Sequence, residues 1–234
     1  MKVLIDQVET SSSKEFYPLR ISRIAVYTAF STALSMIPAF SVFGVEGATI
    51  TLGAITPVIL GTMLPSSDAT IAAIATGILL TILPPPGVFG PLSPLPVILG
   101  TLAATLVYEY RTGSIVAYTA LHIGLLLGFV IASGGEFFTM YPLSIWFHVL
   151  GIVLVLTLFV IKNKLAHKLR LLATSIAGVL VDHATGMFLA QIYFPLATGI
   201  RIPGKIWASI TWIYPVERTI LIIIAYAVVL LLHK

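Results

Sequence analysis

Apolar residues along this chain gather into eight segments that are separated by short polar breaks. The segments run over residues 24–43, 49–64, 69–83, 94–109, 115–132, 143–161, 171–192 and 216–232. A helix needs about 20 apolar residues to cross a bilayer, and most of these segments approach that length. The second and third are shorter and contain or adjoin glycine and proline, which predicts tilted, kinked or re-entrant helices. The pattern predicts an all-α, polytopic transmembrane helical bundle with six to eight spans.

The composition supports a membrane location. Of the 234 residues, 58% are hydrophobic and 9% are charged, and the mean hydropathy is +1.06. An ordinary soluble domain carries about 25% charged residues. We therefore expect one transmembrane helical domain over residues 20–234. Residues 1–19 form a polar segment that is either a cytoplasmic, amphipathic piece or a frayed tail. The chain has no cysteine, which excludes a disulfide and a thiolate ligand.

The distribution of Lys and Arg predicts how the chain is oriented in the membrane. If the loops between eight spans alternate, ten cations fall on one side and three on the other. The ten are Lys2, Lys14, Arg20, Arg23, Arg111, Lys162, Lys164, Lys168, Arg170 and Lys234; the three are Arg201, Lys205 and Arg218. Because cations concentrate in cytoplasmic loops, both termini are expected in the cytoplasm of a multi-pass cell-membrane protein. The net charge of +4 is explained by this bias, and no nucleic-acid partner is expected.

The first apolar segment carries a stripe of small side chains. Ala25, Ala29 and Ala33 recur every four residues, so they share one face of a helix. Small residues at this spacing allow a second helix to approach closely. We predict that this stripe is the interface with a partner in the membrane.

The two ends of the chain resemble the substrate-binding membrane subunits, the S-components, of energy-coupling-factor (ECF) transporters. The alanine stripe is followed by VEGATITLGAITPVILGTMLPSSDATIAAIATGIL, residues 45–79, and the chain closes with PVERTILIIIAYAVVLLL, residues 215–232. The resemblance implies binding of a vitamin-type micronutrient near the outer surface, under the loop that follows the first helix. It also implies two kinds of partner, a transmembrane coupling subunit that packs on the alanine stripe and cytoplasmic ATPase subunits. The family usually has six spans, so residues 94–161 are expected to contain an extra hairpin.

Two ionisable residues lie deep within the seventh apolar segment. Asp182 and His183 are costly inside a bilayer unless they are paired or face water, which makes them the first candidates for substrate binding. Alternatively, they only hydrogen-bond across the bundle. His122 and His148 occupy the fifth and sixth segments, where a buried histidine is more often a core group than a ligand. Three histidines in neighbouring segments also leave metal binding open.

The outer loops supply the remaining candidates for substrate binding. Glu46 lies in the first outer loop and is either part of a gate or a solvated carboxylate. Arg201 and Lys205 stand near Trp207 and Trp212, a combination suited to an anionic or aromatic ligand. The alternative is that these tryptophans belong to the aromatic belt of the membrane interface.

Glu217 and Arg218 open the last apolar segment, directly after Pro215. Proline and glutamate are common in the first turn of a helix, where the proline needs no hydrogen-bond partner and the carboxylate interacts favourably with the helix dipole. We interpret this group as helix-starting residues and not as a binding site.

The sequence indicates a transport subunit and not an enzyme. It lacks H-E-x-x-H, G-x-S-x-G and P-loop motifs, so ATP-driven work requires another subunit. The first hypothesis is a membrane subunit that captures a small solute from outside and needs no cofactor or resident metal. The alternative is a self-contained secondary transporter or proton-coupled permease that uses Asp182 and His183. An intramembrane enzyme or a structural assembly protein is the third possibility.

Overall fold

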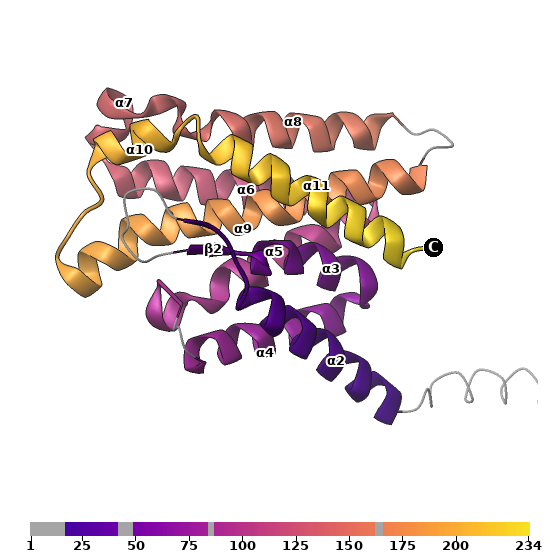
Figure 1. The fold of residues 1–234 in the computed structure, drawn as a ribbon. Helices are drawn as coiled ribbons and strands as arrows, with labels where there is room; N and C mark the ends of the chain where they lie inside the picture. Colours follow the sequence, from indigo (N-terminus) through magenta and orange to yellow (C-terminus); the bar gives the residue numbers. More distant parts are fainter. Residues whose placement is uncertain (1–16, 42–48, 84–86, 162–165) are drawn as a thin grey trace, which may run out of the picture.

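The fold is described from a computed structural model that covers residues 17–41, 49–83, 87–161 and 166–234. Its long helices run side by side along one common direction (Figure 1). In chain order the elements are α2 (Tyr17–Ser35), β1 (Pro38–Ser41), β2 (Thr49–Thr51), η1 (Leu52–Ile55), α3 (Thr56–Met63), α4 (Ser66–Ile82), η2 (Gly90–Leu92), α5 (Pro94–Glu109), α6 (Thr112–Ser133), α7 (Gly135–Met140), η3 (Pro142–Ile145), α8 (Trp146–Val160), α9 (Ala166–Thr198), α10 (Gly204–Ile210) and α11 (Tyr214–Leu232). Each apolar segment of the sequence overlaps a helix, which confirms the all-α prediction, and the short strands β1 and β2 fall within the first two segments.

Five helical stretches among the described residues are long and apolar enough to cross a membrane. They are Gly90–Glu109, Thr112–Ser133, Pro142–Val160, His167–Thr198 and Tyr214–Leu232. Two further apolar helices, Leu52–Met63 and Ser66–Ile82, are shorter. Helix α2 is not among the five because Arg20, Arg23 and several hydroxyl side chains lower its mean hydropathy. The protein is a multi-pass membrane protein, with five such stretches against the six to eight spans expected from the sequence.

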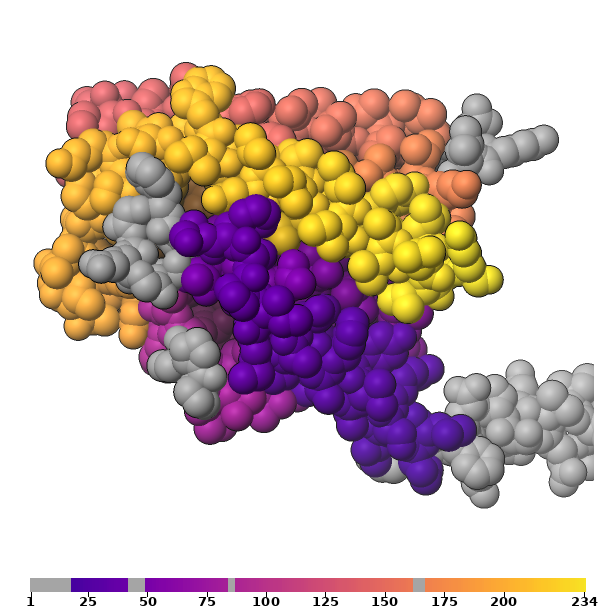
Figure 2. Space-filling view, in the orientation of Figure 1, coloured from indigo at the N-terminus to yellow at the C-terminus, as the bar shows by residue number. Residues whose placement is uncertain are grey.

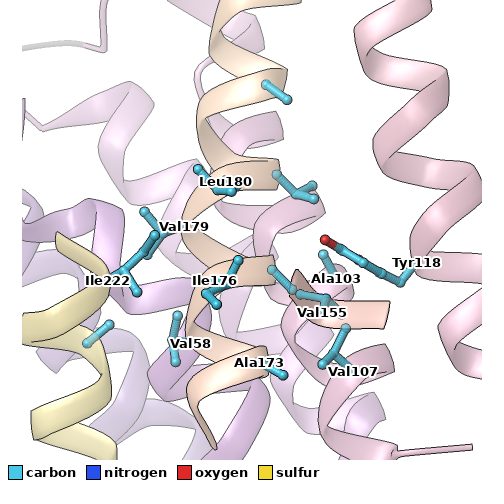
Figure 3. Close-up of a cluster of buried hydrophobic side chains, with 14 of the residues drawn as sticks. Val58, Ala103, Val107, Tyr118, Val155, Ala173, Ile176, Val179, Leu180 and Ile222 are labelled. Atoms are coloured by element: carbon cyan, nitrogen blue, oxygen red, sulfur yellow. The ribbon is translucent and has the colours of Figure 1, made fainter. Parts of the chain in front are cut away.

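Helix α9 lies at the centre of the bundle. It packs against α3, α5, α6, α8 and α11. In an apolar 18-residue window of its membrane-length stretch 72% of the residues are buried, against 28–39% in the corresponding windows of the other four. In Figure 3, Ile222 lies on one side of α9 and Tyr118 on the other, with Ile176 and Leu180 between them. Small and apolar residues predominate around α9, which suits the helix to this central position.

Glycine permits the close approach of α3, α5 and α9. A Cβ atom on Gly61 of α3 would lie 2.7 Å from Ala104 Cβ and 2.9 Å from the backbone nitrogen of Thr105, both in α5. A Cβ atom on Gly178 of α9 would lie 2.8 Å from Val58 Cγ2 in α3. These distances leave no room for a methyl group. Small residues of this kind bring membrane helices into backbone contact.

Polar side chains join several helices at one end of the bundle, which we call the basic end. Arg20 Nε donates to Asp68 Oδ1 at 2.8 Å, and Arg23 Nη2 donates to Asp68 Oδ2 at 3.2 Å. The Ser66 hydroxyl donates to Glu109 Oε1 at 2.9 Å. These bonds bring the starts of α2 and α4 to the end of α5. The start of α9 and the C-terminus lie at the same end (Figure 1).

Most described cations belong to the elements that meet at the basic end. They are Arg20, Arg23, Arg111, Lys168, Arg170 and Lys234. The opposite end carries α7 and α10 (Figure 1), and we call it the cavity end. Arg201 and Lys205 lie at the cavity end, while Arg218 is buried inside the bundle. The fold therefore brings together six of the ten cations that the sequence assigns to one side of the membrane, and Lys2, Lys14, Lys162 and Lys164 lie outside the described residues.

The glycine contact between α3 and α5 leads to a stability prediction. Gly61→Ala places a methyl group against the α5 backbone and should destabilise the protein by about 1–3 kcal/mol. Gly124→Ala is the control, because that glycine is exposed on α6 with nothing within 4 Å of the added carbon. Thermal unfolding in detergent measures both variants. Equal melting temperatures for the two would contradict the proposed close packing.

Candidate functional site

A cavity of about 610 Å³ lies among the elements of the cavity end. Its wall is built from the end of α2, the strands β1 and β2, the end of α4, the start of α5, the second half of α9, α10 and the start of α11. Most of the lining is apolar, including Met36, Ile50, Phe89, Met187 and Trp207. A concave, mainly apolar space of a few hundred Å³ with few polar groups is typical of a small-molecule site.

The connection between α2 and α3 forms part of the cavity wall. Strands β1 and β2 pair antiparallel, and Leu52 N donates to Ile37 O at 2.9 Å. The Thr51 hydroxyl accepts a hydrogen bond from Gly53 N at 3.2 Å and caps η1. A Cβ atom on Gly53 would collide with Ser35 at the end of α2. Because this glycine has no side chain, η1 can pack directly against the end of α2 in this wall of the cavity.

Polar side chains of α9 and α11 form one wall of the cavity, which we call the polar corner. It consists of Asp182, His183, Tyr214, Glu217 and Arg218. Consecutive residues point about 100° apart on a helix, so the cavity must extend over a wide face of α9 to reach both Asp182 and His183. The three α11 residues are spaced i, i+3 and i+4, which places them on one helical face.

Arg218 is buried in the polar corner without a direct partner. The residue is 5% exposed, and its Nε atom is buried without a hydrogen bond. Asp182 and Glu217 are near enough to attract the guanidinium electrostatically. Within the described residues, however, the ion pairs are those of Arg20 and Arg23 with Asp68, and Arg218 forms none. A buried, unpaired guanidinium is energetically costly, which distinguishes this residue from a surface arginine.

A chain of hydrogen-bonded imidazoles leads from the cavity into the core. His183 Nδ1 lies 3.1 Å from His148 Nε2, and His148 Nδ1 lies 3.1 Å from His122 Nε2. His122 Nδ1 lies 3.2 Å from the Tyr118 hydroxyl. We call these four residues the histidine chain. Its bonds within the described part of the protein end at Tyr118, which is fully buried in α6.

Tyr214 holds the cavity end of the histidine chain in place. Its ring lies 4.8 Å from the His183 ring and 5.8 Å from the His148 ring, measured between centroids. Its hydroxyl donates to Ser144 O at 2.7 Å. The aromatic contact and the hydrogen bond fix α11 against α8 and α9. They therefore also fix the position of Arg218, one turn further along α11.

The histidine chain is suited to proton transfer. A neutral imidazole donates from one nitrogen and accepts at the other, so linked rings can align their hydrogen bonds in one direction. A proton that enters at one end can be relayed by changes of tautomer along the chain. In the described segments of the protein, no group of three or more His, Asp or Glu side chains is arranged to hold a metal ion. The histidine chain therefore offers a path for a proton from the cavity toward Tyr118.

The structure brings together three of the residues that the sequence proposes for substrate binding. Asp182, His183 and Trp207 all line the cavity. The first two project from α9, while Trp207 projects from α10 and is 4% exposed. Trp207 is therefore a wall of the cavity and not part of an exposed aromatic belt.

The other proposed binding residues lie elsewhere. Arg201 is exposed and does not line the cavity. Trp212 is 65% exposed, and its ring lies 5.9 Å from the Trp146 ring on the protein surface. Trp212 thus has the position of an interface tryptophan. Glu46 falls outside the described residues.

Sequence reasoning missed Arg218 and Tyr214 as site residues. Both stand at the start of α11, where proline and charged residues have an ordinary helix-starting explanation. The available signal was their i, i+4 spacing together with the position of Arg218 one turn inside an apolar helix. His122 and His148 were recognised as buried, but their mutual contact depends on how α6 and α8 pack.

The alanine stripe lies on the free face of α2. Ala25, Ala29 and Ala33 are exposed, as is the neighbouring Val26, at 65%. Ser31, on the opposite face, is fully buried where α2 packs against α4. Figure 2 shows α2, in indigo, on the surface of this side of the molecule, with its first turns projecting beyond the other helices. The stripe is therefore available to lipid or to a partner helix.

The chain matches no protein-family model, no curated protein and no solved structure. The likeness to ECF S-components therefore rests on the sequence features quoted above. The features that bear on function are the cavity, the polar corner and the free surface of α2.

Proposed function

We propose that this protein is the substrate-binding membrane subunit of an importer. It captures a small, vitamin-type solute from outside the cell and passes it inward with the help of separate ATP-driven subunits. The observation that carries this proposal is the cavity of about 610 Å³ at the cavity end, with its polar corner on one wall. Its size and mainly apolar lining suit one small organic molecule.

The charge distribution supports an orientation with the cavity end outside. Cations are retained on the cytoplasmic side of a membrane protein. The basic end therefore faces the cytoplasm, with both termini, and the cavity receives solute from the external solution. The short α3 and α4 lie beside full-length helices, so they add to the bundle without each needing to cross the whole membrane.

The alanine stripe supports a docking partner within the membrane. The stripe exposes only small side chains, those of Ala25, Ala29 and Ala33, and α2 lies at the outside of the bundle. Close helix packing over small residues is a common mode of association between membrane helices. The proposed partner is a transmembrane coupling subunit, which in turn binds ATPase subunits. No catalytic role is assigned to this chain itself.

The histidine chain favours a second candidate function, a proton-coupled permease that works alone. In that case His183 exchanges protons with Asp182 or solute in the cavity, and His148 and His122 relay them toward the core. The gradient would then supply the energy that the first proposal assigns to ATPases.

The orientation is tested by labelling single cysteines in a chain that has none of its own. With a membrane-impermeant maleimide on intact cells, Ser209→Cys should be labelled because Ser209 is exposed on α10 at the cavity end. Lys234→Cys should be labelled only after the cells are opened. The reverse result would place the cavity in the cytoplasm.

The partner surface is tested by Ala29→Trp. This exposed substitution should change the free energy of unfolding by only about 0.5 kcal/mol or less, yet it should abolish co-purification with a membrane coupling subunit. Val153→Trp, at an exposed position of α8, is the matched control and should retain the partner. Retention of the partner by both variants would remove the alanine stripe as the docking surface.

The second candidate is tested with purified protein alone in liposomes that contain a pH-sensitive dye. A proton-coupled permease should acidify the interior when an inward proton gradient is applied, and His148→Phe should abolish the signal by breaking the chain between His122 and His183. His167→Phe, exposed at the start of α9, is the control. A silent wild-type protein would exclude this candidate and leave the partner-dependent importer.

A further inference from the structure

Arg218 differs from every other arginine in the described part of the chain. It lines the cavity, is 5% exposed and has neither an ion pair nor a hydrogen bond there. Arg20 and Arg23 bind Asp68, Arg170 lies over the Tyr108 ring, and the remaining arginines are at the surface. Arginine keeps its positive charge inside proteins, so its burial calls for a compensating anion.

The protein supplies that anion only in part. Asp182 and Glu217 attract Arg218 through space, but neither makes an ion pair with it. Both carboxyl groups also line the cavity, so they are available to accept hydrogen bonds from a bound molecule. The polar corner thus combines one planar donor for an acid with two acceptors for N–H or O–H groups.

The apolar lining of the cavity limits which molecules can bind beside these polar groups. Phe89, Met187 and Trp207 contribute apolar and aromatic surface, which suits a flat hydrophobic body. Asp182 and Glu217 repel a doubly charged anion more strongly than a single carboxylate, and one guanidinium matches one carboxylate. Guanidinium and carboxylate match in shape and form paired, charge-assisted hydrogen bonds.

We propose that the cavity binds a monocarboxylate with an apolar, ring-containing body and at least one N–H or O–H donor. Arg218 binds the carboxylate, and Asp182 or Glu217 accepts from the donor. This proposal rests on the proposed function of solute capture and adds the chemical class of the solute. It assigns the ligand anion to Arg218, inside the cavity, and not to the exposed Arg201.

The proposal is tested with indole-3-acetate, which carries a carboxylate, a flat ring and an N–H group. Isothermal titration of the full chain in detergent should show that indole-3-acetamide, which lacks the charge, binds at least about tenfold more weakly. 1-Methylindole-3-acetate, which lacks the N–H donor, should also bind more weakly. Equal affinity for the acid and the amide would overturn the role of Arg218.

Variants locate the anion within the protein. Arg218→Gln should remove the preference for acid over amide, and Arg218→Lys should retain part of it because the charge remains without the planar fork. Arg201→Gln is the matched control at the same end of the bundle and should leave the preference unchanged. If Arg218→Gln fails to fold, the comparison of the three indoles on wild-type protein still decides the matter.

A last pair of measurements separates this inference from the proposed function and from lipid binding. Mass spectrometry of the purified protein should find a retained carboxylic acid, and a retained neutral or cationic molecule would contradict the anion proposal while preserving solute capture. No retained molecule and no indole binding would contradict both. Indole-3-acetate binding that disappears in nanodiscs with anionic phospholipid, but not with phosphatidylcholine alone, would assign the corner to a lipid headgroup and overturn a free solute.

Discussion

Because Gly61, Gly100 and Gly178 have no side chains, helices α3, α5 and α9 meet almost backbone to backbone. A Cβ atom on Gly100 would lie 3.0 Å from the carbonyl oxygen of Gly178. A methyl group at this position would therefore push α5 and α9 apart. In a membrane, where lipid tails are as apolar as leucine, such close packing is a main source of helix association. The contact sets the position of α9, and through α9 the position of the polar corner.

The cavity is bounded by the ends of several helices and by the side of α9. Helix α2 ends at Ser35, and the chain continues into the paired strands β1 and β2, which form part of the cavity wall. Helix α11 begins beside the middle of α9, so its first turn faces inward. The cavity is therefore formed by helix ends meeting the side of a continuous helix. Charged groups at such ends can be enclosed without interrupting the central helix.

Much of this architecture could be predicted from the apolar pattern alone, since every expected segment contains helix, although the pairing of β1 and β2 within the first two segments was not predicted. The membrane character and the choice of Asp182 and His183 as candidates followed from hydropathy, because ionisable groups are conspicuous in an apolar helix, and both residues line the cavity. Arg218 did not stand out, since a first-turn charge has a local explanation. The histidine chain could not be predicted either. Each of its three imidazoles lies on a different helix, and a distance between helices depends on packing that no single segment encodes.

The 33 residues of α9 correspond to about 50 Å of helix at a rise of about 1.5 Å per residue, well beyond the ~30 Å of a bilayer core. Asp182 follows the start of α9 by 16 residues, or about 24 Å along its axis. The polar corner thus lies near the middle of α9. Under the proposed function, a solute that binds there must shed part of its hydration shell. The cavity can then select a solute through the free energy of dehydration. Only a molecule whose polar groups form new hydrogen bonds in the polar corner regains the free energy that it lost on leaving water.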